Sequence, residues 1–183
     1  MRMLAAAALV GLLAGPAGAD EVTETIEAAL EAYNAGDIPA AKEELDYAAQ
    51  LLSQMKAEGL TGYLPEAMDG WTRALSEGQS MGAAMFGGGI MAEATYSGAG
   101  EELTMQLVAD SPMVASMAAM FASTATMSAM GRVKRINRVN FVMTDGEVRG
   151  MVGAVLVQLT GNASEDAMIA HIERLDFEAL EDF

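Results

Sequence analysis

An α+β fold is predicted for this 183-residue chain: an N-terminal antiparallel helical hairpin, then an antiparallel sheet with helices packed on one face. Two observations lead to this prediction. Apolar residues recur at helical spacing from Val22 to Met55. After Trp71 the period shortens to the alternation typical of strands, and the strands are joined by short turns. Strands joined directly as hairpins must pair antiparallel, and interspersed helices then cover the sheet.

The helical hairpin is predicted over residues 20–58. The first helix, 22–35, ends at Gly36, a residue type common at helix C-caps. Asp37 suits the N-cap of the second helix, with Pro39 in its first turn. The second helix carries a stripe of apolar residues and ends near Glu58: Ala41, Leu45, Ala48, Leu52 and Met55. So short a connection makes the two helices antiparallel.

The hairpin sequence resembles one tetratricopeptide repeat. The likeness lies in the run from Ala32 to Ile38, with its aromatic residue and Gly-Asp pair, and in the alanines and leucine that follow at 41, 45 and 48. A stable stack of such repeats needs about three. We therefore expect a single helical hairpin docked on another domain, and not a peptide-binding repeat array.

Residues 59–70 are predicted to be a linker, and residues 71–183 an α+β domain. Trp71, the only tryptophan, opens its first strand. Strands are expected over 72–77, 90–96, 103–108, 133–137 and 139–144, and one long return strand over 148–159. Asp145-Gly146 predicts a two-residue hairpin turn. Helices are expected after the caps Ser111, where Pro112 follows, and Ser164.

The N-terminus has the pattern of a cleavable signal peptide over residues 1–19. Arg2 precedes a short apolar run, 4–13, and Ala17-Gly18-Ala19 matches the small-residue cleavage site. Because the apolar run is too short to span a membrane, we expect cleavage before Asp20, no stable membrane anchor, and a periplasmic or secreted protein. An uncleaved anchor is the alternative. The chain has no cysteine, so its stability must come from an apolar core.

The charge is strongly acidic and unevenly distributed. The predicted mature chain has 9 basic and 26 acidic residues, or −17, because removing residues 1–19 removes only Arg2. Residues 20–69 hold 12 acids against two lysines, which gives −10, whereas five basic residues gather between Arg132 and Arg149. This charge argues against nucleic acid and anionic lipid surfaces as partners.

Candidate binding residues are few. Trp71 is a candidate ligand platform or, alternatively, a core anchor. The basic residues Arg132, Arg135 and Arg138 are a candidate anion patch, although strand alternation splits them between two faces. Met113, Met117 and Met120 form one helical stripe, and Met81, Met85 and Met91 flank a glycine run. Thioethers suit Cu(I), but a methionine stripe more often packs in a core.

No catalytic constellation or cofactor is predicted. His171, the only histidine, borders an apolar helix face without an orienting carboxylate, and Asp110-Ser111-Pro112 matches a helix cap better than a nucleophile. The leading prediction is a non-catalytic, soluble exported protein that binds an unknown protein or small ligand or supports another envelope component. A small-ligand or Cu(I) carrier using the Met-rich region is the alternative, and a hydrolase is a third class.

A wider resemblance covers most of the mature chain. Its motifs are short: Gln50-Leu51-Leu52, Gly59-Leu60, Leu64 to Trp71, and Asp110-Ser111-Pro112-Met113 before a Met-rich helix. With these motifs the sequence resembles a family of uncharacterised exported bacterial proteins. The Pro-Glu…Gly-Trp opening of the second domain is also similar to small lumenal and periplasmic proteins of the PsbP-like fold. That resemblance implies a fold, and no activity follows from either one.

Overall fold

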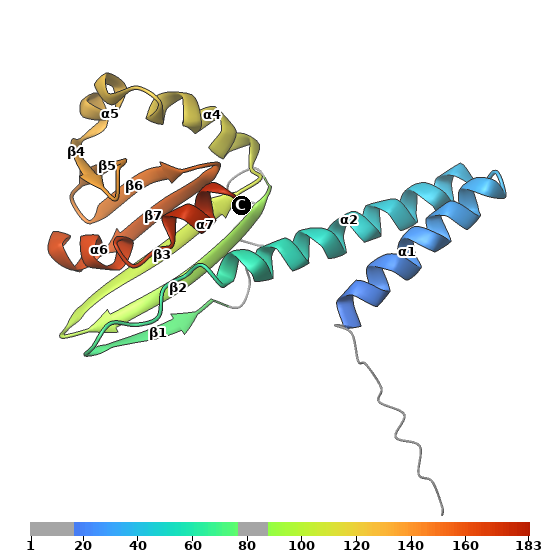
Figure 1. Cartoon of the computed structure of the whole chain (residues 1–183), viewed down its shortest axis with the longest axis horizontal. Coiled ribbons are helices and arrows are strands. Elements are labelled where there is room, and N and C mark those ends of the chain that lie inside the picture. Colours follow the sequence, from blue (N-terminus) through green and yellow to red (C-terminus); the bar gives the residue numbers. More distant parts are fainter. Residues whose placement is uncertain (1–16, 77–87) are drawn as a thin grey trace, which may run out of the picture. The chain divides into compact units, whose positions relative to one another are not determined.

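A computed structural model describes residues 17–76 and 88–183 (Figure 1). The chain divides into two compact units between Leu52 and Ser53. Most of the predicted signal peptide, and Met81 and Met85 of the Met-rich region, lie outside the described residues.

The N-terminal unit is built on an antiparallel helical hairpin, α1 (Ala17–Asn34) and α2 (Ile38–Thr61), as predicted. Gly36 has φ +82°, a conformation that favours glycine, and the Asp37 amide donates to the Ala32 carbonyl to close the end of α1. The Asp37 carboxylate then accepts from the Ala40 amide at 3.1 Å and caps α2. These two caps reverse the chain within three residues.

The second unit contains a seven-stranded sheet in the order β1-β2-β3-β7-β6-β5-β4, and all pairs are antiparallel. Because β7 is the fourth strand in this order, it lies at the centre of the sheet. The strands are β1 (Trp71–Leu75), β2 (Ile90–Gly98), β3 (Glu101–Ala109), β4 (Arg132–Ile136), β5 (Val139–Thr144), β6 (Glu147–Val152) and β7 (Val155–Gly161).

Two-residue turns join β2 to β3, β4 to β5, β5 to β6 and β6 to β7. Thr144 pairs with Glu147 across Asp145-Gly146, which confirms the two-residue hairpin. The prediction of one strand over 148–159 is wrong, because Val152 pairs with Val155 across a second two-residue turn. Gly153 has φ +57° in that turn, and a Cβ there would lie 2.8 Å from the Glu181 backbone. The continuous apolar run is therefore two adjacent strands, each with buried residues.

The described residues of this unit also form four helices: α4 (Pro112–Phe121), α5 (Thr124–Met130), α6 (Glu165–Ile172) and α7 (Phe177–Glu181). Ser111, Ser123 and Ser164 cap the first three of these by accepting bonds from backbone amides three residues on. Ser111 and Ser164 were both expected as caps. The Ser123 cap starts a separate helix, so the Met-rich helix ends at Phe121.

The main core lies between the sheet and α6 and α7. Large side chains such as Leu103, Leu107 and Leu159 are fully buried there, together with Ile172 and Leu180. This arrangement confirms the α+β fold, an antiparallel sheet with packed helices. The prediction placed the helices on one face of the sheet, where α6 and α7 lie, but α4 packs on the other face. A smaller cluster on the opposite side joins Val114 of α4 to Met91, Val108 and Leu156.

Residues 53–70 also contribute to this unit. α2 continues to Thr61, and Leu60 and Leu64 are buried in the main core. Part of the segment predicted as a linker, 59–70, therefore packs in the core of this unit.

Candidate functional site

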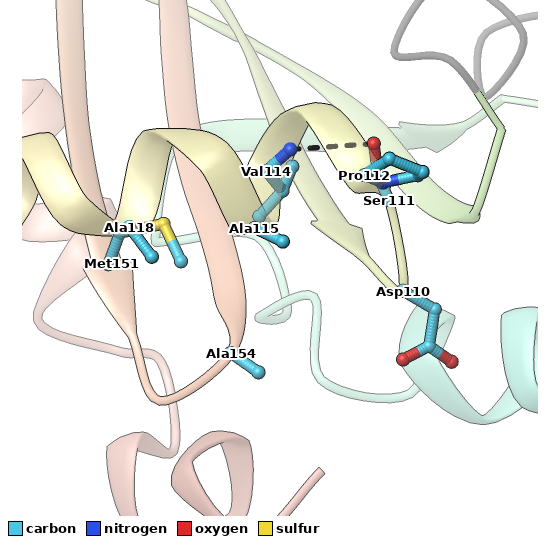
Figure 2. A pocket seen from close by; sticks show the side chains of 8 residues that line it. All are labelled: Asp110, Ser111, Pro112, Val114, Ala115, Ala118, Met151 and Ala154. Carbon is cyan, nitrogen blue, oxygen red and sulfur yellow. Dashed lines mark hydrogen bonds between the residues drawn. The ribbon is translucent and has the colours of Figure 1, made fainter.

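The described part of the chain presents four candidate sites: a groove beside α4, an aromatic cluster around His171, the basic residues of β4, and an apolar face on the hairpin. The groove has a volume of about 350 Å³ and lies between α4 and the β6–β7 turn. Figure 2 shows the side chains that line it. Six of these eight residues are apolar: Asp110, Ser111, Pro112, Val114, Ala115, Ala118, Met151 and Ala154, of which the first two are polar.

The polar residues of the groove serve the turn that leads into α4. Asp110 has φ +53°, an uncommon conformation that Asp tolerates better than most residues. Its carboxylate points away from α4 (Figure 2) and accepts a 2.6 Å bond from Lys56. Ser111 accepts from the Val114 amide at 3.5 Å. Both groups therefore have structural roles, and the groove suits an apolar group.

The methionine stripe on α4 is not core. Met113 and Met120 are 42% and 43% exposed, and only Met117 packs against the small cluster. Core packing, the interpretation that the sequence favours, is therefore wrong for Met113 and Met120. Within residues 17–76 and 88–183, no group of three His, Cys, Asp or Glu side chains could hold a metal ion. Binding of Cu(I) by the thioethers stays a prediction.

Trp71 belongs to an aromatic cluster in the main core. Its ring lies edge-on to His171 with centroids 4.8 Å apart, and Tyr96 lies at the same distance from His171. Gly98 pairs with Trp71, and a Cβ on Gly98 would lie 2.7 Å from the indole. Trp71 is partly buried and packed on the core, which supports the anchor interpretation. Tyr96 was not among the predicted site residues, since β2 and β1 meet only through sheet pairing.

His171 is fully buried on α6. Its Nδ1–H donates to the Ala167 carbonyl at 2.8 Å, and its Nε2 is a buried atom without a hydrogen-bond partner among the described residues. Burial, opposed by the bond to Ala167 and aided by the charge of Arg174, lowers the pKa of His171. Burial also raises the pKa of Tyr96 to about 12, and its hydroxyl donates to the Pro65 carbonyl at 2.6 Å. The imidazole of His171 therefore has no exposure to solvent in this arrangement.

The basic residues divide as strand alternation predicts. Arg132 points toward α6, where it pairs with Glu165. Arg138 lies in the β4–β5 turn with φ +71°, and its carbonyl accepts a 3.1 Å bond from Arg135 Nε. The structure therefore brings Arg135 and Arg138 together and leaves Arg132 on another side. Anion binding by these residues stays a prediction.

The hairpin carries an exposed apolar surface. Its interior is lined by small or short side chains: Val22, Thr25, Ala29, Ala41 and Ala48. Six large side chains remain 45–63% exposed: Ile26, Leu30, Tyr33, Ile38, Leu45 and Leu52. We call these six residues the hairpin apolar face.

Helix geometry places all six on one side of the hairpin. At 3.6 residues per turn, the exposed apolar residues of α1 are rotated about the helix axis by about 75° from the buried residues of the same helix. On α2 the corresponding rotation is about 50°. The rotation has the same direction in both helices when each is viewed from its N-terminus to its C-terminus. Two antiparallel helices with displacements of equal sense present both stripes on the same side. The opposite side carries the hydrogen bond from the Tyr47 hydroxyl to Glu21, 2.7 Å long. That bond raises the pKa of Tyr47.

Among the helices of the described residues, none is long and apolar enough by itself to cross a membrane. α4 and α5 together meet the criterion of length and composition, but they are bent by 103° at their break.

Comparisons with protein families, curated proteins and solved structures give no match to this chain. The resemblances to an uncharacterised exported family, to one tetratricopeptide repeat and to the PsbP-like fold therefore stay predictions.

Proposed function

We propose that this is an exported, non-catalytic protein that binds another protein through the hairpin apolar face. The observation that carries the proposal is the distribution of side-chain size in the hairpin, with small side chains inside and large apolar ones outside. Its helices contact each other through alanine, valine and threonine, while six large apolar side chains face outward. Large apolar patches rimmed by polar residues are typical of interaction sites, whereas scattered apolar residues are not.

The spacing favours a helical partner. Ile26, Leu30 and Tyr33 recur at i, i+4 and i+7, and the row on α2 runs beside them. Two parallel rows of this kind form a groove into which the ridge of another helix packs. The proposal that the protein is exported rests on the signal-peptide pattern of residues 1–19.

A binding role fits the remaining candidate residues better than catalysis. His171 is fully buried and Ser111 caps α4, so the two residues that most resemble catalytic groups in the sequence have structural roles. A general base must come within hydrogen-bond reach of a substrate.

Site-specific photo-crosslinking in the native host tests this function. A photoreactive residue at Leu45, on the hairpin apolar face, should yield a defined protein adduct, and the same residue at Glu43, on the polar side, should not. Adducts are recovered from the periplasmic fraction, where an intact mass beginning at Asp20 tests export. Equal adducts from both positions, or none from either, would contradict the proposal.

One observation favours the alternative, a small-ligand or Cu(I) carrier. Met113 and Met120 are exposed on α4, which also lines the apolar groove of about 350 Å³. Titration with Cu(I), followed by sulfur-edge spectroscopy, should then show thioether ligation. Replacing Met113, Met117 and Met120 with Leu should abolish it with folding intact.

A further inference from the structure

We infer that the partner of the hairpin apolar face is a second copy of this chain, and that two hairpins pair into an antiparallel four-helix bundle. This inference rests on the proposed function for the surface and names its occupant. Three features of the hairpin support it: its incomplete burial, the area it offers, and the placement of its charges.

A single helix pair of this kind leaves part of its apolar surface open. In helical-repeat proteins each pair buries its remaining face against the next pair in the stack. This chain forms only one such hairpin within its described residues. A second copy supplies a neighbour with the same apolar spacing, and a twofold pairing closes at two chains without leaving a further open face. Antiparallel neighbours throughout give the packing of a four-helix bundle.

The area is sufficient for a specific pair. Six large side chains that are each about half exposed offer on the order of 500–600 Å² per copy. Symmetric pairing therefore buries roughly 1,000–1,200 Å² in total from these side chains, at the lower bound for a specific interface. A pair of this size forms reversibly and depends on protein concentration.

The charges permit the pairing without burying a carboxylate. By helical spacing, Glu24, Glu27 and Glu31 lie on the side of α1 away from the stripe, and Glu43 and Asp46 lie similarly on α2. Lys42, paired with Asp46, borders the face. The net charge of −16 per chain nevertheless opposes association at long range. Added salt screens that repulsion, so pairing of two copies should tighten with salt. A basic partner would bind more weakly as salt rises.

Sedimentation equilibrium of the whole purified protein tests the inference. We expect a monomer–dimer equilibrium that shifts toward dimer as NaCl rises from low concentration to roughly 0.5 M. The variant Leu30→Glu with Leu45→Glu should weaken dimerisation by about 100-fold or more, since it places charges in the apolar interface. The matched control, Ala28→Glu with Gln50→Glu, adds the same charge at exposed positions off the face and should leave most of the dimer.

A second measurement does not depend on disrupting the hairpin. The chain has no cysteine, so Leu45→Cys and Glu43→Cys each carry a single spin label. Pulsed electron paramagnetic resonance should give a shorter intermolecular distance for position 45 than for position 43. Equal distances, or a longer one at 45, would show that the copies meet through another surface.

A monomer at every salt concentration, or a dimer that survives Leu30→Glu with Leu45→Glu, overturns the inference. The proposed function is judged separately by the crosslink at Leu45. An adduct with a mass other than twice that of the chain would support the proposed protein-binding function and would show that the partner is a different protein. The absence of any adduct would contradict both the proposed function and the inference that the partner is a second copy.

Discussion

In the sheet unit, Leu103, Leu107 and Leu159 are fully buried, whereas in the hairpin Leu30, Leu45 and Leu52 are about half exposed. The same residue type thus serves two purposes in one chain. In the sheet unit large side chains fill a core covered by α6 and α7. In the hairpin, small side chains let the helices approach closely and large ones remain on the surface. Apolar periodicity in a sequence therefore identifies a stripe of residues without identifying what covers it.

The largest expected difference comes from removing the same side chain in both regions. Leu159→Ala, at the centre of the sheet, should lower the free energy of unfolding by about 2–5 kcal/mol, since it leaves a cavity in a packed core. Leu45→Ala should change it by about 0.5 kcal/mol or less in dilute protein, because the side chain is half exposed and alanine favours helix.

Native-state hydrogen exchange measures each region separately, on the strands for Leu159→Ala and on residues 20–52 for Leu45→Ala. Comparable losses from the two variants would contradict this difference between the two regions.

A smaller effect is expected inside the hairpin, where the substitution enlarges a side chain and does not remove one. Ala48→Leu adds volume where α1 and α2 meet and should destabilise the hairpin by about 1–3 kcal/mol, because close helix contact leaves no room for it. Faster amide exchange in residues 20–52 would report this loss. Ala28→Leu adds the same side chain at an exposed position of α1 and serves as the control. If Ala48→Leu is as well tolerated as the control, small residues do not set the spacing of the two helices.

Local chemistry made much of the fold predictable from the sequence. The caps at Asp37, Ser111 and Ser164 and the Asp145-Gly146 turn depend on neighbours within a few residues, so their residue types indicate them directly. The turn at Gly153-Ala154 was missed because an unbroken apolar run on each side masked it.

The candidate site was less predictable, because it depends on how side chains divide between inside and outside. The sequence places Ala41, Leu45, Ala48 and Leu52 in one apolar stripe. In the structure the alanines face inward and the leucines outward. An apolar stripe about 100° wide can contact the neighbouring helix through either of its two edges. The edge with the smaller side chains allows the closer approach, so that edge faces the neighbouring helix. The exposure of Met113 on α4 was missed for the same reason.

The two regions should also differ in their response to acid, because His171, the only histidine of the chain, lies in the sheet unit. Burial lowers the pKa of His171 below 6.5, so the imidazole binds a proton more weakly in the folded chain than in the unfolded chain. Between the lowered folded pKa and about 6.5, the unfolded state binds more protons, and stability therefore falls as pH decreases through that interval. Above the interval His171 contributes no pH dependence.

His171→Phe should flatten this part of the pH profile of sheet stability, because an aromatic ring between Trp71 and Tyr96 is kept and the titrating group is removed. Hydrogen exchange of β1, β2 and α6 at several pH values measures the slope, with residues 20–52 as an internal reference that contains no histidine. Carboxylates elsewhere contribute to acid sensitivity in both proteins, so the difference between wild type and His171→Phe isolates the imidazole. An unchanged slope in the variant would mean that protonation of His171 is not what couples pH to the stability of this unit, even though the ring is fully buried.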